Sequence, residues 1–443
     1  MSAAAITRAP TPSQWTLGVL VVFAAVGFGF GNWLARLPAV RDHLGASTFE
    51  MSIIGLVMAA GAVLGLVFSG RIVVWIGPRR TMILAAIGQA IFMPLGVTLL
   101  WFGFEIPGML ALAAFGFSFS NGDVAMNVSG AAAERALGKP RMPLLHGGYS
   151  LGSVTAMGVG ALAEVLQVPV PIHVAIVFGL IVTAVLIASR WIPLVESVPE
   201  ESGAAGADPQ AADPRDAAPH AAAPRGADSN RVNTNTDPVQ VLANPEDAVP
   251  AGPERYNAWR DSRIIVIGLI VMSITLSEGT ATDWLPLALT DARGFANEVA
   301  ALALGTFYTA MLVTRAAGSW LLTRFGRVFV LRGSALISIA GIVLLYALPF
   351  PWVGFVCAAL WGVGSALGFP IGVSAAADDP AKSVSGVATV SIIAYGAFLV
   401  GPMAIGIAGE HFGLLAAFLP LTLFLAFAAI AAGTAREPGA RKA

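Results

Sequence analysis

The stretch Gly27–Pro38, GFGFGNWLARLP, ends the first long apolar run of the chain, and it has a counterpart, TATDWLPLAL, at 280–289. Within these two stretches, Asn-Trp-Leu at 32–34 matches Asp-Trp-Leu at 283–285. The sequence therefore repeats itself about 250 residues apart, as membrane proteins built from internal repeats do. Two further matches occur in the same order, GRIVVWIGPRR (70–80) with SWLLTRFGR (319–327), and VSGAAAE (128–134) with VSAAADD (373–379).

The composition is that of a membrane protein. Of the 443 residues, 56% are hydrophobic and 12% are charged, and the mean hydropathy is +0.77. Soluble domains carry about 25% charged residues. Apolar runs of about the 20 residues that cross a bilayer predict an all-α membrane protein with twelve transmembrane helices. The predicted spans are 15–37, 50–74, 81–103, 108–133, 143–166, 172–193, 264–288, 298–321, 328–348, 352–377, 384–408 and 412–433.

The basic residues are distributed unevenly between the predicted loops. Of the 25 lysines and arginines, only Arg41 and Arg293 fall in loops on one side, while Arg36 and Arg315 fall within spans. The remaining 21 lie on the side of the two termini. Because Lys and Arg accumulate in cytoplasmic loops, we expect both termini in the cytoplasm. The net charge of −1 gives no signal for a nucleic-acid partner.

Residues 195–262 differ in composition from the rest of the chain. They are rich in Ala, Pro, Asp and Gly and contain few large apolar residues, which predicts a disordered cytoplasmic linker. The linker separates six spans from six spans. The predicted units are a cytoplasmic tail (1–14), a six-helix bundle (15–194), the linker, a second six-helix bundle (263–433) and a cytoplasmic tail (434–443).

Two parallel six-helix repeats joined by a long linker resemble the major facilitator superfamily of transporters. More narrowly, the chain resembles a subgroup of bacterial permeases of this superfamily. The resemblance covers both halves and spares only the linker and tails, and it implies a monomeric permease of the bacterial inner membrane. It depends on GNWLARLPAVRDHLG (31–45), NGDVAMN (121–127), RMPLLHGGYSLG (141–152), SEGTATDWLPLAL (277–289) and LWGVGSALGFPIGVSAAADDPA (360–381).

Two loops look like the superfamily's signature between the second and third helices, which implies a role in gating. Val74 and Thr323 occupy the positions where an acidic residue usually forms the gating ion pair. We therefore expect Glu134, Asp378 or Asp379 to replace that acid by pairing with arginines of these loops. The loop residues concerned are Gly70, Gly77, Arg79 and Arg80 in the first half, and Arg324, Gly326 and Arg327 in the second.

Five of the charged residues within the predicted spans are candidates for a role in transport. Each charge near the bilayer centre costs about 2.5–3.5 kcal/mol, so such residues normally face a water-filled cavity. Asp123, Glu278 and Asp283 are the candidates for reversible protonation, since burial favours a neutral carboxyl. Arg36 and Arg315 are candidates to bind a carboxylate or phosphate or to act as counter-ions. The alternatives are that Arg36 reaches the outer surface and that Arg315 bonds backbone carbonyls or serves the gate.

Helical spacing places further polar residues beside these charges. Asn32 and Arg36 share one face of the first helix, and Asp123 and Asn127 share one face of the fourth. Aromatic side chains in the spans are candidates to stack on a solute, although packing is the alternative for each of them. The candidate solute-binding residues are Asn32, Trp33, Arg36, Asn127, His146, Tyr149, Ser150, Trp284, Tyr308, Arg315, Trp361 and Tyr395.

These observations predict a secondary active transporter for a small polar solute, with an anion among the candidates, driven by a proton gradient. An exporter is the first alternative, and a membrane sensor or scaffold is the second. Gly148–Gly152 matches the GxSxG motif of serine hydrolases, but that motif needs a preceding strand, so we expect no enzyme. With Cys357 as its single cysteine, the chain is expected to need neither a metal nor a cofactor.

Overall fold

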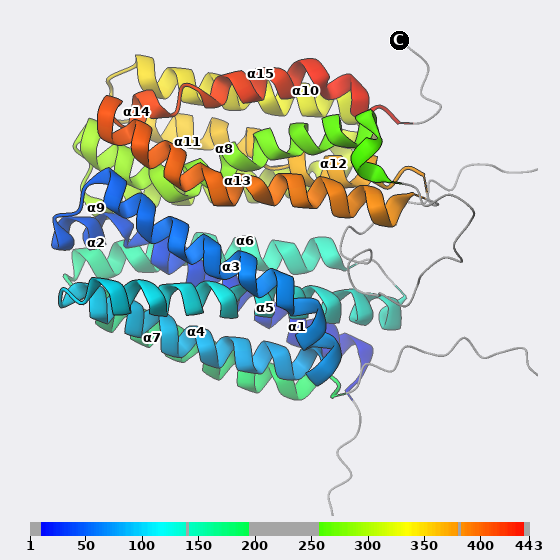
Figure 1. Ribbon diagram of the computed structural model, residues 1–443, viewed down its shortest axis with the longest axis horizontal. Coiled ribbons are helices and arrows are strands. Elements are labelled where there is room, and N and C mark those ends of the chain that lie inside the picture. Colours follow the sequence, from blue (N-terminus) through cyan, green and yellow to red (C-terminus); the bar gives the residue numbers. More distant parts are fainter. Residues whose placement is uncertain (1–9, 139–140, 195–256, 380–381, 438–443) are drawn as a thin grey trace, which may run out of the picture.

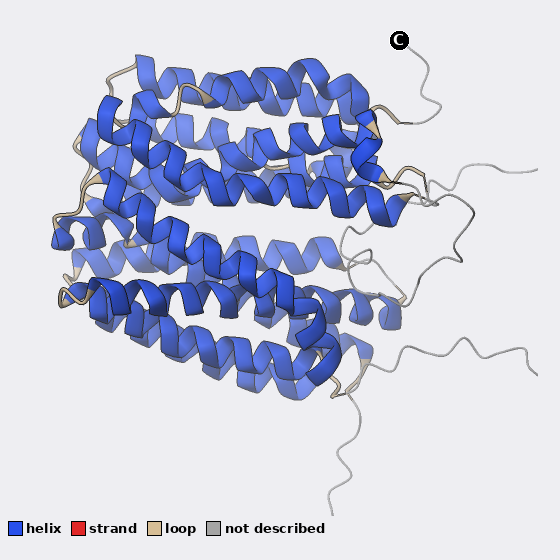
Figure 2. Cartoon of the chain, in the orientation of Figure 1, coloured by secondary structure: helices blue, strands red, loops and turns tan. Residues whose placement is uncertain are grey.

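The computed structural model describes residues 10–138, 141–194, 257–379 and 382–437, and the regular secondary structure of these ranges is helical (Figure 2). Helices α1 to α7 form the N-terminal half, at the bottom of Figure 1. Their bounds are α1 Pro12–Ala35, α2 Leu37–Leu44, α3 Thr48–Ile76, α4 Pro78–Trp101, α5 Glu105–Leu137, α6 Met142–Val165 and α7 Val170–Ala188, followed by a 3₁₀ turn at Ser189–Trp191.

Helices α8 to α15 form the C-terminal half, at the top of the same view (Figure 1). A 3₁₀ turn at Ala258–Arg260 precedes this half, and another at Ala432–Ala435 follows it. The bounds are α8 Ser262–Arg293, α9 Asn297–Ala316, α10 Gly318–Ala347, α11 Val353–Ser365, α12 Gly368–Ala376, α13 Ser383–Phe412, α14 Leu414–Ala417 and α15 Leu421–Ala431.

Eleven helical segments of the described residues are long and apolar enough to cross a membrane. The fifth predicted span, 143–166, corresponds to α6, which is not among the eleven. With 24 residues, α6 is about 36 Å long and could cross the apolar core, but its polar stripe and glycines reduce its hydropathy. The chain is thus a multi-pass membrane protein, while the count of twelve spans and the side of the termini remain predictions.

The repeat seen in the sequence recurs in the backbone. Gly77 joins α3 to α4 with φ 83° and ψ 153°, and Gly326 adopts φ 75° and ψ 162° inside α10. Side chains disfavour positive φ, so glycine is the residue that permits both bends. Gly326 divides α10 into two helical parts, and only the second part corresponds to the predicted span 328–348.

The glycines of the opening stretch serve helix packing. A Cβ atom at Gly27 would lie 2.1 Å from the backbone oxygen of Tyr149, and one at Gly152 would lie 2.2 Å from that of Ala24. The backbones of α1 and α6 are therefore in direct contact, as small residues allow in membrane proteins. This contact fixes the position of Tyr149 relative to α1.

The predicted linker lies mostly outside the described residues, which resume at position 257. The second half begins slightly earlier than predicted, because Ala258 is buried and belongs to a 3₁₀ turn. Asp261 then caps α8, since its Oδ1 accepts a hydrogen bond of 2.9 Å from the backbone N–H of Arg263.

Candidate functional site

A cavity of about 370 Å³ lies between the two halves. Helices α1, α2, α3, α5 and α6 line it from one half, and α8, α9 and α13 from the other. Its volume is at the lower end of the roughly 300–1,000 Å³ typical of small-molecule sites. Most of the wall is apolar. The charged, hydroxyl-bearing and indole side chains in the wall are those of Trp33, Ser120, Asp123, Tyr149, Ser150, Glu278, Thr282, Asp283, Trp284, Tyr308, Arg315 and Tyr395.

Arg315 is held by two partners at the edge of this cavity. Its Nη2 lies 3.4 Å from Oε1 of Glu278, and its Nε donates a 3.1 Å hydrogen bond to the backbone oxygen of Ala366. Ala366 lies between α11 and α12, where the α11 helix has ended and its carbonyl is free to accept. Both interpretations of Arg315 from the sequence therefore apply together: it is a counter-ion and it binds a backbone carbonyl.

The other two acids in the wall have no such cation. Among the ion pairs of the described residues, none involves Asp123 or Asp283. Asp123 accepts a weak 3.4 Å hydrogen bond from Nδ2 of Asn127, and Asp283 accepts one of 3.4 Å from the Thr282 hydroxyl. With three carboxyls and one guanidinium, the ionised wall carries a formal charge of −2 (3 − 1 = 2 surplus acids).

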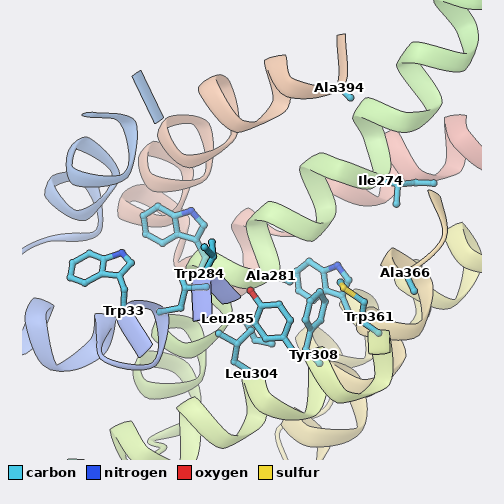
Figure 3. Close-up of a cluster of buried hydrophobic side chains, with 14 of the residues drawn as sticks. Trp33, Ile274, Ala281, Trp284, Leu285, Leu304, Tyr308, Trp361, Ala366 and Ala394 are labelled. Atoms are coloured by element: carbon cyan, nitrogen blue, oxygen red, sulfur yellow. The ribbon is translucent and has the colours of Figure 1, made fainter. Parts of the chain in front are cut away.

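Aromatic side chains share the cavity wall with these acids. Trp33 on α1 and Trp284 on α8 lie near each other from opposite halves (Figure 3). Tyr149 of α6 and Tyr395 of α13 line the same cavity as Asp123. The indole Nε1 of Trp284 is buried and has no hydrogen-bond partner among the described residues. Five of the six predicted tryptophan and tyrosine residues thus line the cavity, and Trp361 does not.

Arg36 is not part of the cavity wall, so the structure does not bring it together with the other predicted solute-binding residues, and its contact with the solute stays a prediction. It is only 3% exposed, its Nη2 lies 3.0 Å from Oε2 of Glu164, and it donates a 2.8 Å hydrogen bond to the oxygen of Val168. The alternative of an arginine reaching the outer surface is wrong. The reason is local: α1 ends at Ala35, and Arg36 turns toward the loop between α6 and α7.

Asn32 and Trp361 are also buried away from the cavity wall. The amide of Asn32 donates a 2.8 Å hydrogen bond to the oxygen of Phe28, one turn earlier on α1. The indole of Trp361 is fully buried, donates a 2.7 Å hydrogen bond to the Ser277 hydroxyl and packs edge-on against Phe418. These contacts make Trp361 a packing residue between α11 and α8, as the alternative interpretation proposed.

His146 and Asn127 are not part of the cavity wall. The imidazole of His146 contacts Phe23 edge-on, with ring centroids 5.1 Å apart, and it is not part of the cavity wall. Asn127 bonds the backbone oxygen of Asp123 at 2.9 Å. Ser150 lines the cavity, but its hydroxyl donates to the backbone oxygen of His146 at 3.2 Å rather than to the imidazole. This arrangement does not form the serine–histidine pair that a hydrolase needs.

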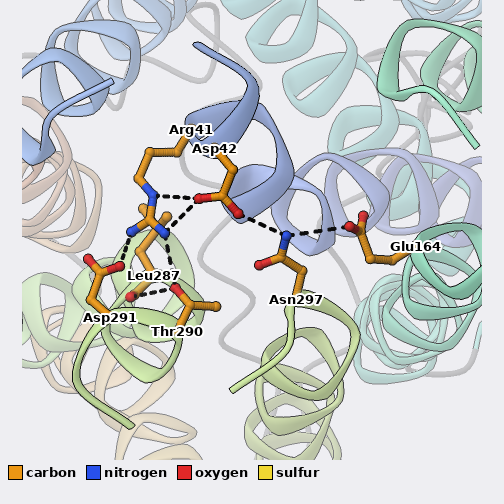
Figure 4. A network of polar contacts seen from close by, with 7 residues as sticks. All are labelled: Arg41, Asp42, Glu164, Leu287, Thr290, Asp291 and Asn297. Atoms are coloured by element: carbon orange, nitrogen blue, oxygen red, sulfur yellow. Dashed lines mark hydrogen bonds and ion pairs between the residues drawn. The ribbon is translucent and has the colours of Figure 1, made fainter. Parts of the chain in front are cut away.

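A network that the sequence did not predict joins the two halves at the end that carries α2 (Figure 4). Arg41 of α2 forms an ion pair with Asp291 of α8. Asn297 of α9 donates hydrogen bonds to Asp42 at 3.1 Å and to Glu164 at 3.4 Å. From the sequence alone, charged residues in short loops are expected to be solvated. Only the packing of the two halves shows that these residues contact one another.

At the opposite end, the predicted gating residues make contacts within one half. Asp378 lies 2.7 Å from both Arg263 and Arg327, so its expected pairing with a loop arginine is present. Glu134 instead accepts hydrogen bonds from the backbone N–H groups of Arg141 and Met142. Among the described residues, the ion pairs at this end join residues of the same half.

The remaining gating candidates follow the same pattern. Arg79 donates a 3.0 Å hydrogen bond to the oxygen of Ile192 at the end of the N-terminal half. Arg324 lies over the Phe325 ring, 5.9 Å from its centroid, and Asp379 lies 3.4 Å from Lys382. Arg80 is exposed. The structure thus places these residues at one end of the molecule, while their role in gating stays a prediction.

No family model matches the chain. Curated relatives do: the chain is 30% identical over 434 residues to an uncharacterized transporter of Sinorhizobium fredii, covering 95% of this chain and 98% of that one. It is 24% identical over 408 residues to an uncharacterized MFS-type transporter of Yersinia pestis, covering 91% of each. It is also 24% identical over 416 residues to the membrane protein MosC of Rhizobium meliloti, covering 90% of this chain and 86% of that one.

Solved structures share the fold. A mutant of the nucleoside transporter NupG matches with a TM-score of 0.70 at 14% identity, over 95% of this chain and 99% of that chain. A bacterial homolog of the lysosomal transporter Spinster matches with a TM-score of 0.65 at 12% identity, over 99% and 100%.

Proposed function

The chain belongs to the major facilitator superfamily, and from this premise we propose that it is a secondary active transporter that moves a small polar solute across the bacterial inner membrane in symport with protons. One observation carries the proposal. The cavity between the two halves contains two carboxyls, Asp123 and Asp283, that have no cationic partner among the ion pairs of the described residues. Such groups in a membrane mark ion and substrate pathways.

Alternating access follows from the distribution of contacts between the halves. With both termini in the cytoplasm, the Arg41–Asp291 network lies on the outer side and keeps that end of the cavity closed. The ion pairs of Asp378 on the other side stay within one half and leave the halves free to separate there. We infer that the structure represents the state open to the cytoplasm, and that breaking the outer network begins the return to the outward-open state.

The two acids without a cationic partner support proton coupling. A carboxyl in an apolar wall is stabilised by taking up a proton or a cation when it leaves water. Each proton that crosses with the solute contributes about 2.3 kcal/mol per 100 mV of membrane potential. The anionic solute considered from the sequence loses its basis, because Arg36 is outside the cavity and Arg315 is already paired with Glu278.

The test uses the purified full-length chain in proteoliposomes, with a metabolite panel and an imposed pH gradient. We expect solute uptake that accelerates when the outside is acidic. In Asp123→Asn, Asp283→Asn and Glu278→Gln, the acceleration should fall at least tenfold. Glu105→Gln is the matched control, because Glu105 is an exposed acid on the same helix as Asp123.

Three outcomes would contradict this function. Flux that ignores the gradient and is unchanged in the acid variants would reject proton coupling. Solute movement that is driven only against the proton flow would indicate an exporter. Absence of any flux across the panel would favour a sensor or scaffold with the same fold.

A further inference from the structure

We propose that the solute carries a protonated amine and that Asp123 is its counter-charge in the cavity. This inference rests on the proposed function in one respect, that the central cavity is the solute site. It goes further because it assigns the chemical class of the solute. It is argued from the charges of the cavity wall, from the aromatic side chains that share this wall with Asp123, and from the unpaired indole N–H of Trp284.

The charge balance of the cavity wall argues against an anionic solute. Glu278 is offset by Arg315, which leaves Asp123 and Asp283 as two uncompensated acids. An anionic solute would add a third negative charge to this surplus. A solute with one ammonium group offsets one acid and leaves the second for the coupling proton. With a cationic solute, the ammonium group neutralises one acid and the coupling proton neutralises the other, so neither acid remains charged in the membrane.

The surroundings of Asp123 suit an ammonium group in particular. Asp123 lies on α5, and Tyr149 of α6 and Tyr395 of α13 line the same cavity. All three residues belong to the cavity wall. A carboxylate and aromatic rings in one cavity suit an ammonium ion, because ring faces attract a cation and the carboxylate neutralises its charge. Asn127 holds this part of α5 in place through its bonds to Asp123.

A second feature of the wall indicates what the rest of the solute provides. Trp284 is 3% exposed, and its Nε1 donor has no partner among the described residues. An unpaired buried donor costs free energy unless a ligand or water accepts its hydrogen bond. Since Trp284 lines the cavity beside Trp33 (Figure 3), the solute is expected to present an oxygen acceptor to Trp284 and a ring-sized body to the indole faces.

The test is equilibrium binding to the purified full-length protein, measured by isothermal titration calorimetry. Its probes are matched triplets in which each charged member differs from the neutral member at a single carbon: benzylamine, benzyl alcohol and benzoate, and glucosamine, glucose and glucuronate. We expect the amine of at least one triplet to bind at least tenfold more tightly than its neutral partner, with the carboxylate weakest. Asp123→Asn should lower the affinity for that amine at least tenfold and change that for the neutral partner less than twofold. Glu105→Gln should change neither.

Several results would overturn the inference. These are a neutral or carboxylate member that binds most tightly in both triplets, an absence of amine binding up to 20 mM, or an equal loss of all affinities in Asp123→Asn. The comparison within each triplet uses the unaltered protein, so it holds even where a variant does not fold. The binding measurement needs no proton gradient, so the two proposals can fail separately. Amine-selective binding without proton-driven flux would reject only the proposed proton coupling. Proton-driven flux of a solute without amine preference would reject only the proposed amine class of the solute.

Discussion

Arg41 on α2 and Asp291 near the end of α8 form an ion pair that joins the two halves of the molecule (Figure 4). Both side chains are partly exposed, at 15% and 41%, so the pair contributes at most about 1 kcal/mol. That amount is enough to change the ratio of two conformations severalfold, because 1.4 kcal/mol corresponds to a factor of ten.

We therefore expect Asp291→Asn to increase the outward-open fraction by about two- to fivefold. Leu37 lines the cavity near this end, so a cysteine introduced by Leu37→Cys reports on access from outside. The measurement is the rate at which this cysteine is labelled by a membrane-impermeant maleimide added to intact cells. The native Cys357 is fully buried. Arg293→Gln is the matched control, since Arg293 bonds the backbone oxygens of Leu345 and Leu348 within its own half. A labelling rate unchanged by Asp291→Asn would show that the ion pair does not hold this end closed.

For the Arg315–Glu278 pair, we expect a second substitution to restore part of the stability that the first one removes. Removing the guanidinium in Arg315→Gln leaves Glu278 without its cation in an apolar wall, which should abolish transport and destabilise the fold by about 1–3 kcal/mol for this partly exposed pair. Glu278→Gln in the same chain removes the stranded charge. The double variant is expected to unfold at a higher temperature than Arg315→Gln alone, as measured by thermal unfolding in detergent. Additive losses in the double variant would argue against the pairing.

The pair of the buried Arg36 and the partly buried Glu164 should matter for stability and not for solute recognition. Arg36→Met leaves Glu164 without its cation, so we expect a loss of about 1–3 kcal/mol in folding stability. The KM for the solute should stay within twofold for the protein that does fold. The Arg36→Met/Glu164→Leu double variant should recover part of the loss, because Nε and Nη1 of Arg36 have no hydrogen-bond partner even now. A changed KM at unchanged thermal stability would return Arg36 to the list of solute contacts.

The contact between α1 and α6 predicts the effect of a single methyl group. Gly27→Ala would place a Cβ atom 2.1 Å from the Tyr149 backbone oxygen, so the two helices must separate and Tyr149 must move. We expect a lower unfolding temperature and at least a fivefold loss of transport. Gly147→Ala on α6 is the control, since a Cβ atom there meets no atom within 4 Å. Equal behaviour of the two variants would refute the packing role of the opening stretch.

The membrane class, the repeat and the family were readable from the sequence, since they depend on local hydropathy and on residues that recur in order. The cavity residues were only partly predictable. Asp123, Glu278, Asp283, Trp33, Trp284, Tyr308 and Arg315 lie at the cavity as expected. Arg36 and Trp361 share the same features in sequence but do not line it. Helical periodicity gives the face on which a side chain lies, and it does not give the neighbour that this face meets.

The opening stretch illustrates the division. Its sequence determined that a membrane helix with small residues ends near Pro38 and has a repeat partner at 280–289. Only the tertiary structure decided that Trp33 lines the cavity while Arg36, one turn later, is buried against Glu164. The helix end at Ala35 redirects the chain between these two residues. An ion pair between residues 128 positions apart (164 − 36 = 128) is a property of how helices pack, and hydropathy along one helix carries no information about it.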